Sequence, residues 1–173
     1  AALASSPPFQ PQIPLLLEIG PEGLEGVAAS LRFTPSEHPL ASIVIPAFNH
    51  IDYTLRCLAA IHRHLPEASY ELIVVDDASS DATERLLSAI PGLRYVRNPE
   101  NLGFLRTANR GAALAQGRYL LFLNNDTQVL SGWLDRLLDV FATVPDAGIV
   151  GAKLIYPSGH LQEAGAALRQ DGT

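Results

Sequence analysis

The sequence predicts an α/β protein, a three-layer α/β/α sandwich with a Rossmann-like, mostly parallel sheet. Two observations support this prediction. Short apolar runs alternate with amphipathic stretches from residue 40 onward, and strands separated by helices pair in parallel through right-handed crossovers. With 173 residues, 47 % of them hydrophobic, the chain can bury one core of ordinary size.

The first 39 residues differ in composition from the rest. They hold seven of the thirteen prolines, and proline lacks the amide proton that regular ladders need. Residues 1–39 are therefore expected to form a Pro-rich arm or linker, in which IPLLLEIG at 13–20 could pair as a short edge strand. Residues 40–173 are expected to form one folded domain.

The first elements of that domain have distinct signatures. The β-branched run SIVIP at 42–46 is too short for a helix and apolar on both faces, which is typical of a buried parallel strand. Asp52 can cap the helix that follows. The apolar residues of this helix recur at helical spacing: Leu55, Leu58, Ile61 and Leu65.

The alternation continues to the end of the readable pattern. Further strands are predicted at 71–75, 93–96, 118–123 and 148–156. Helices are predicted at 80–90, at 103–117 with Gly117 as its left-handed C-terminal cap, and after Ser131 as an N-cap.

Polar clusters follow three of the predicted strands. They are AFNH after the first, DDASSD after the second and NNDT after the fourth. Because the carboxyl ends of parallel strands meet at one sheet edge, where such sheets bind ligands, the clusters are expected to lie together. This coincidence is the strongest functional signal in the sequence.

Each cluster also has a plain structural interpretation. Asp76 and Asp77 could cap the next helix and form an Asx turn, or one of them could accept hydrogen bonds from a base or ribose. NNDT could be a polar turn, yet Asp126 suits a hard divalent cation, which takes oxygen ligands. One carboxylate is a weak site, so phosphates would have to complete it and metal and nucleotide should bind together.

Other polar features indicate less. His62 and His64 are two apart on a helix and do not share a face, which disfavours a metal pair. The N-glycosylation triplet at 125–127 is discounted because the sequence shows no secretory signal. His160 and Glu163 are expected in an ordinary loop.

Composition limits the class of protein. A net charge of −6 offers no basic footprint for nucleic acid, and the sequence has no apolar run long enough to span a membrane. The single cysteine, Cys57, is expected to be a reduced, packed thiol, which favours the cytosol. Without a methionine, the chain is expected to be a piece of a longer protein, whose other parts could associate with a membrane.

Three segments together resemble a known family. They are SIVIPAFNH at 42–50, YELIVVDDASSDAT at 70–83 and NPENLGFLRTANRGAALAQGRYLLFLNNDTQVLSGWL at 98–134. In this order they resemble the nucleotide-binding half of the inverting family-two glycosyltransferases with the A-type fold. The NND motif is similar to that of the bacterial, rhamnosyltransferase-like branch, in which it replaces Asp-any-Asp.

The resemblance implies a nucleotide-sugar donor, either a UDP-sugar or a dTDP-sugar. The first loop would cradle base and ribose, with Phe48 packed on uracil or thymine. Asp77 would accept the imide proton of the base, with Asp76 beside it. Gly103 and the residues after it would line the diphosphate and sugar. The loop residues are Pro46, Ala47, Phe48 and Asn49.

The resemblance also implies a metal site. Asp126 would hold Mg²⁺ or Mn²⁺ against the diphosphate, and Asn125 would hydrogen-bond the ribose. Because an amide replaces one carboxylate of the commoner motif, metal affinity should fall.

The family continues into an acceptor half with an acidic general base, and no such element is recognisable here. The general base is therefore unknown and expected beyond Thr173. The chain is expected to bind donor for transfer to a carbohydrate acceptor, in bacterial polysaccharide synthesis, without transferring sugar by itself.

Other classes fit less well. A dinucleotide-binding domain needs a glycine-rich turn after its first strand, which SIVIP lacks. A receiver domain has its acidic pair after the first strand and a lysine after the last, whereas Lys153 lies inside the predicted final strand. A non-catalytic nucleotide-sugar-binding or interaction module remains the alternative.

Overall fold

The computed structural model describes residues 17–20 and 22–164. The chain forms two compact units, with Leu17–Asp139 as the larger one and the stretch from Val140 onward in the smaller one. Across the described residues, no helix combines the length and apolar character that crossing a bilayer requires.

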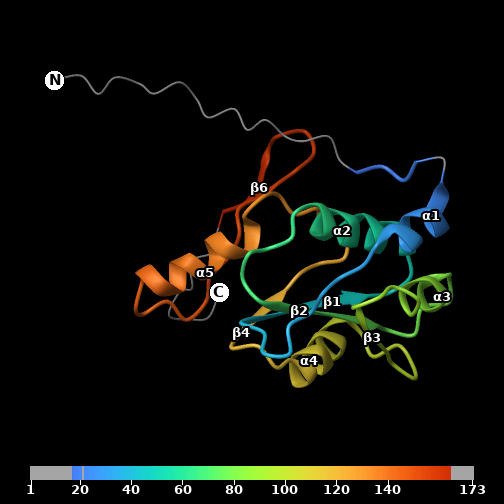
Figure 1. The fold of residues 1–173 in the computed structure, drawn as a ribbon, viewed down its shortest axis with the longest axis horizontal. Coiled ribbons are helices and arrows are strands. Elements are labelled where there is room, and N and C mark those ends of the chain that lie inside the picture. Colours follow the sequence, from blue (N-terminus) through green and yellow to red (C-terminus); the bar gives the residue numbers. More distant parts are fainter. Residues whose placement is uncertain (1–16, 21, 165–173) are drawn as a thin grey trace. The chain divides into compact units, whose positions relative to one another are not determined.

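The larger unit is built on a four-stranded parallel sheet (Figure 1). Its strands lie in the order β3-β2-β1-β4. Their bounds are β1 Ala41–Ala47, β2 Tyr70–Asp76, β3 Arg94–Arg97 and β4 Tyr119–Phe122. Every residue of β1 and β2 is buried, as expected for strands that are apolar on both faces.

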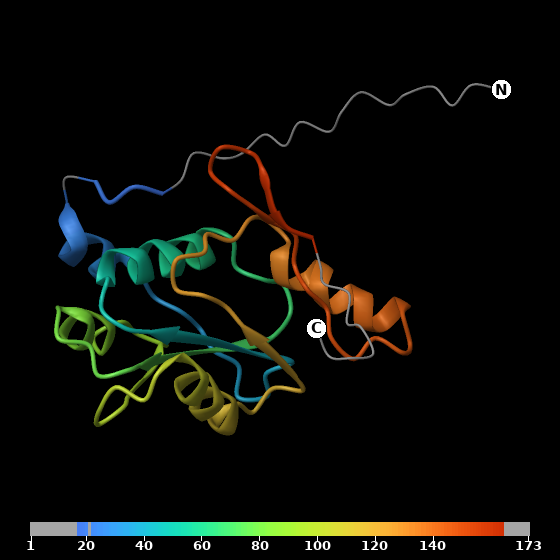
Figure 2. The same cartoon turned by 180° about the vertical axis from the view of Figure 1, so that it is seen from behind.

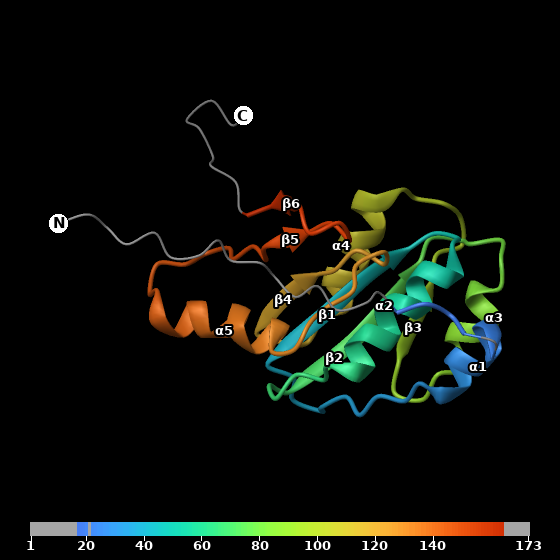
Figure 3. The ribbon, with the colours of Figure 1, turned by 90° about the horizontal axis from the view of Figure 1, so that it is seen from above.

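Helices cover both faces of this sheet. The helix α2 (Ile51–Arg63) lies across β1 and β2 on one face (Figure 3), and α4 (Phe104–Leu114) lies on the other (Figures 1 and 2). A large apolar cluster joins α2 to Ile43 and Ile45 of β1, whereas Val44 packs in a second cluster with Leu114 of α4. Successive residues of β1 therefore pack into apolar clusters on opposite faces of the sheet. The predicted three-layer α/β/α sandwich is confirmed.

A helix forms within residues 1–39, where an arm or linker without a helix was expected. The helix α1 spans Gly23–Ser30, and Ala28, Leu31 and Phe33 are buried in the large apolar cluster. The spacing of Leu24, Val27, Ala28 and Leu31 is a helical apolar stripe, which the proline content obscured. The edge strand suggested at 13–20 lies partly outside the described residues, and residues 17–20 form no strand.

The start of α2 differs from the prediction. Asp52 lies inside the helix, and the capping position is taken by His50 in the left-handed conformation, with φ of 52°. The side chain of Asp81 accepts a hydrogen bond from Ile51 N at 3.0 Å, so an acid from another loop satisfies this N-terminal amide. The helix ends at Arg63, which leaves Leu65 outside it and half exposed.

Gly117 does not cap α4, contrary to the prediction. The helix ends at Leu114, with Ala115 already extended. A Cβ atom on Gly117 would lie 2.6 Å from Ser42 N and 2.7 Å from Ala41 C, and Gly117 N donates to Ser42 Oγ at 2.8 Å. The glycine is needed because the chain passes close to the backbone of β1.

Gly117→Ala is expected to lower the free energy of unfolding by about 1–3 kcal/mol, because a main-chain neighbour cannot move aside as a flexible side chain would. Urea unfolding followed by circular dichroism measures it. Gly148→Ala is the matched control, since a Cβ there meets no atom within 4 Å. Equal midpoints for the two variants would contradict the close approach.

The end of the chain departs most from the prediction. The helix α5 spans Trp133–Thr143, so Ser131 is separated from its first residue by Gly132. In the smaller unit only β5 (Leu154–Ile155) forms a strand within the predicted 148–156, and it pairs antiparallel with β6 (Leu161–Glu163). The prediction of one long strand was wrong because Gly148 and Gly151 interrupt it.

Candidate functional site

The strand order reverses between β1 and β4. From β1 to β3 each strand lies on one side of its predecessor, and β4 returns to the other side of β1. Parallel sheets bind ligands at such a switch point, outside the carboxyl ends of the strands. A cavity of about 400 Å³ lies there. It is lined by Pro46, Ala47, Phe48, Asp77, Asn101, Gly103, Phe104, Thr107, Asn124, Asn125 and Asp126.

The cavity brings together seven of the residues singled out from the sequence. They are Pro46, Ala47, Phe48, Asp77, Gly103, Asn125 and Asp126. Of the four other lining residues, Phe104 and Thr107 belong to the segment after Gly103, and Asn101 and Asn124 received no role of their own from the sequence. All four belong to the quoted segment 98–134, so their proximity to Gly103 and Asp126 was the available signal.

Two aromatic side chains give the cavity an apolar wall. Phe48 follows β1 and is 48 % exposed, and Phe104 begins α4 and is 64 % exposed. Exposed rings beside a cavity offer flat surfaces on which a heterocyclic base can stack.

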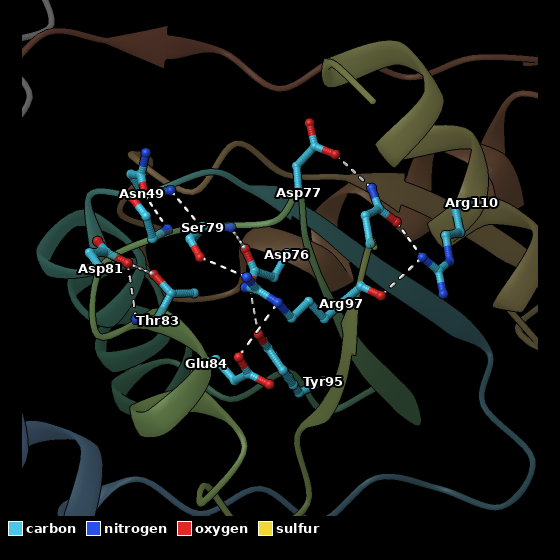
Figure 4. Close-up of polar contacts among 12 residues, drawn as sticks. Asn49, Asp76, Asp77, Ser79, Asp81, Thr83, Glu84, Tyr95, Arg97 and Arg110 are labelled. Carbon is cyan, nitrogen blue, oxygen red and sulfur yellow. Dashed lines mark hydrogen bonds and ion pairs between the residues drawn. The ribbon is translucent and has the colours of Figure 1, made fainter. Parts of the chain in front are cut away.

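Asn49 lies outside the cavity lining. Its Oδ1 accepts hydrogen bonds from Ser80 N at 2.8 Å and from Ser80 Oγ, and its own N donates to Ser79 Oγ at 2.7 Å (Figure 4). With a φ of 53°, it turns the chain into α2. The geometry favours a role in joining the loop after β1 to the loop after β2.

Asp76 is fully buried and also outside the cavity lining. Its Oδ1 accepts a hydrogen bond from Ser79 N at 2.9 Å, and its Oδ2 accepts bonds from Arg97 and from the Tyr95 hydroxyl (Figure 4). The turn-forming interpretation therefore suits Asp76, and both its oxygens are engaged within the protein.

Asp77 borders the cavity although only 4 % of it is exposed. Its Oδ1 accepts hydrogen bonds from Asn98 Nδ2 at 2.7 Å and Leu102 N at 2.8 Å, and its Oδ2 accepts one from Gly103 N at 2.9 Å. Asp77 thus holds the loop that leads into α4 and does not cap the helix α3 (Thr83–Leu87).

The hydrogen bonds also keep Asp77 ionised. Burial raises the pKa of this carboxyl, but the donors at Leu102, Asn98, Thr107 and Gly103 together bring the pKa below its usual value. A carboxylate that accepts hydrogen bonds therefore faces the cavity at neutral pH.

Two residues of α2 contact the NND loop that follows β4. Asn125 Nδ2 donates to the buried Thr54 Oγ1 at 3.0 Å, and Cys57 Sγ lies 3.7 Å from Asn124 O. Burial, with the nearby charge of Asp126, raises the pKa of Cys57 to about 12, so the thiol stays protonated. The packed thiol expected from the sequence is confirmed.

The loop offers oxygen atoms suited to a divalent cation. Asp126 is exposed and lines the cavity together with the amides of Asn124 and Asn125. Within residues 17–20 and 22–164, no cluster of three or more His, Cys, Asp or Glu side chains could hold a metal ion. The loop contributes one carboxylate, so a divalent cation bound there would need phosphate oxygens of a ligand as further partners.

Comparison with known proteins places these features in a family. The model of glycosyl transferase family 2 matches residues 42–166. The O-antigen biosynthesis protein RfbC of Myxococcus xanthus is 30 % identical over 148 residues, covering 82 % of this chain and 11 % of RfbC. The chain spans less than half the length of curated relatives that it matches.

Solved structures share the fold. S. aureus TarS 1–349 in complex with UDP-GlcNAc has a TM-score of 0.54 at 22 % identity, covering 60 % of this chain and 31 % of TarS. The mannosyltransferase PcManGT from Pyrobaculum calidifontis, in complex with GDP-Man and Mn²⁺, has a TM-score of 0.58 at 19 % identity, covering 75 % and 39 %. Because the family model matches most of the chain in the segment that forms the sheet and the cavity, the protein belongs to glycosyl transferase family 2.

Proposed function

We propose that this chain is the donor-binding part of a glycosyltransferase. It would bind a nucleotide-diphosphate sugar with Mg²⁺ or Mn²⁺ for inverting transfer to a carbohydrate acceptor, in bacterial polysaccharide synthesis. One observation supports this above all: the Phe48 ring and the Asp77 and Asp126 carboxylates line one cavity at the switch point of the sheet. The name of RfbC supports the polysaccharide role.

A uracil or thymine base fits the chemistry of the cavity. The imide N–H of these bases is a donor, and the ionised Asp77 can only accept. Asn98 and Leu102 N donate to Oδ1, whereas Gly103 N donates to Oδ2, so Oδ2 is the less occupied oxygen in these three bonds. The Thr107 hydroxyl, a further partner of the carboxylate, lines the same cavity. The UDP-GlcNAc complex of TarS agrees with such a donor, whereas the GDP-Man complex of PcManGT makes guanine the base to test against it.

Calorimetric titration with UDP, dTDP and GDP, each with and without Mn²⁺, tests the proposed function. We expect UDP and dTDP to bind in the presence of Mn²⁺ and far more weakly without it. Binding of none of the three would contradict the proposal. Tighter binding of GDP would contradict the role of Asp77 in selecting the base.

The chemistry of transfer is a further part of the proposal. Attack by an acceptor hydroxyl needs a base, which typically contributes about 10²–10⁴-fold, and the acids beside the cavity have other partners or roles. Glu163 lies in the exposed strand β6. We propose that the chain alone binds donor without turning it over, and that a longer chain with the next acidic pair is active. Comparable turnover by both would reject this and would make Glu163 the first residue to substitute.

A non-catalytic nucleotide-sugar-binding module is the alternative function. The chain covers 11 % of RfbC and 31 % of TarS, so its likeness to them leaves the fate of the bound sugar open. Donor binding by the short chain, with no transfer by the longer chain to any acceptor in a sugar panel, would favour this module.

Asp77→Asn is expected to weaken UDP binding about tenfold or more, and binding of inorganic diphosphate much less. An amide presents a donor where the imide proton needs an acceptor, and it can satisfy only part of the bonds from Leu102 and Gly103. Calorimetry with both ligands in Mn²⁺ measures the two losses. Equal losses would show that Asp77 only supports the loop.

A further inference from the structure

We propose that Asn98 is a positioning residue for Asp77, held in its working orientation by Arg110, so that these two side chains set the preference for uracil over cytosine. The inference deepens the proposed function and rests on it. Neither residue lines the cavity, and both act through Asp77.

Asn98 is anchored at the end of the sheet. It directly follows β3, its backbone N donates to Asp76 O at 2.7 Å, and its side chain is almost fully buried, with 1 % of the residue exposed. Its Nδ2 donates to Asp77 Oδ1 at 2.7 Å and to Thr107 Oγ1 at 2.9 Å. Because its backbone and its side chain are both hydrogen-bonded and buried, the Asn98 amide has little freedom to move when a ligand binds.

Arg110 determines which way the Asn98 amide faces. The Arg110 guanidinium donates to Asn98 Oδ1 and also to the backbone oxygen of Arg97 at 3.1 Å (Figure 4). A guanidinium can only donate and a carboxylate can only accept, so the amide oxygen must face Arg110 and the amide nitrogen must face Asp77. Reversing the amide would set oxygen against carboxylate and nitrogen against guanidinium.

The consequence is that one oxygen of Asp77 is reserved for the protein. Asn98 and Leu102 N together fill the acceptor positions of Oδ1, and Gly103 N takes one position on Oδ2. Oδ2 then presents the acceptor side that Asn98 and Leu102 leave open, in a fixed direction and beside the Thr107 hydroxyl, which is a further partner of Asp77. The N3–H of uracil can donate to it, whereas N3 of cytosine carries a lone pair and is repelled. Without Asn98, the carboxylate can turn and Oδ1 regains an open position, so the match to uracil weakens.

Two variants test this role, each with a control variant of the same residue type on α4. Asn98→Ala removes the donor to Asp77, and Arg110→Met removes the guanidinium that orients this donor, together with its hydrogen bond to Arg97 O. Asn109→Ala and Arg106→Met alter exposed residues of α4 with the same side chains. In calorimetry with Mn²⁺, we expect Asn98→Ala to bind UDP about tenfold more weakly and CDP less than about threefold more weakly. Arg110→Met should change in the same direction, and both controls should match the wild type.

A second readout needs no ligand. NMR titration of the Asp77 carboxyl should show a higher pKa in Asn98→Ala and in Arg110→Met, because each variant loses support for the charged form. The pKa should be unchanged in the two controls. Should Asn98→Ala fail to fold, Arg110→Met decides. Unchanged titration of Asp77 together with an unchanged ratio of UDP to CDP affinity, in a folded variant, would overturn the inference. A wild-type chain that binds neither nucleotide would overturn the proposed function. The titration of Asp77 would then be the only test of whether Asn98 and Arg110 support its carboxylate.

Discussion

Asp126→Ala is expected to abolish Mn²⁺-dependent binding of UDP while leaving the fold intact. The side chain is exposed on a loop and lines the cavity, so it contributes little to the core. Within the described residues no group of three or more acids, histidines or cysteines offers an alternative metal site. Loss of a group that hydrogen-bonds a metal ligand commonly weakens metal binding about 10–100-fold, so loss of the proposed carboxylate ligand itself should cost about a hundredfold or more.

The measurement is UDP titration with and without Mn²⁺, together with thermal unfolding of each variant. Asp146→Ala is the control because Asp146 is equally exposed and does not line the cavity. The control should keep the metal dependence of the wild type. Persistent metal dependence in Asp126→Ala would remove Asp126 from the site.

Asp76→Ala is expected to lower the free energy of unfolding by about 3 kcal/mol, although the sequence suggested a place for Asp76 beside the nucleotide. The buried carboxylate accepts from Arg97, from the Tyr95 hydroxyl and from Ser79 N. Its removal leaves these donors without their acceptor in a region of little water, which is among the costlier losses for a single side chain.

Glu84→Ala is the matched control for this prediction. Glu84 lies 3.5 Å from the same guanidinium, that of Arg97, but its side chain is 62 % exposed. Exposed ion pairs contribute little, so the expected loss is below about 0.5 kcal/mol. Urea unfolding of both variants measures the difference. Similar losses would mean that burial does not decide the role of Asp76.

The sequence predicts the sheet well because its central strands are short, apolar on both faces and separated by amphipathic helices. The same pattern places Phe48, Asp77 and Asp126 at one edge, and the cavity confirms that they meet there. The resemblance to family-two glycosyltransferases is confirmed at the level of the family. The rhamnosyltransferase-like branch stays a prediction.

Sequence could not separate Asp76 from Asp77. The two carboxylates are adjacent, and their roles depend on partners about twenty residues further along the chain, Arg97 and Asn98. Such contacts follow from the pairing of β2 with β3, which places Asp76 opposite Arg97. Local pattern carries no information on which of two neighbouring acids will meet an arginine there.

The cross-links between the first two loops have a consequence for the thermodynamics of binding. Ser79 and Ser80 hold Asn49, and Asp81 holds both Ile51 N and Thr83 N. These bonds form when the chain folds, so the conformational entropy of the loop beside Phe48 is already lost before any nucleotide arrives. Ligand binding then loses little further conformational entropy in this loop. The loop should therefore show the same amide hydrogen exchange with and without UDP.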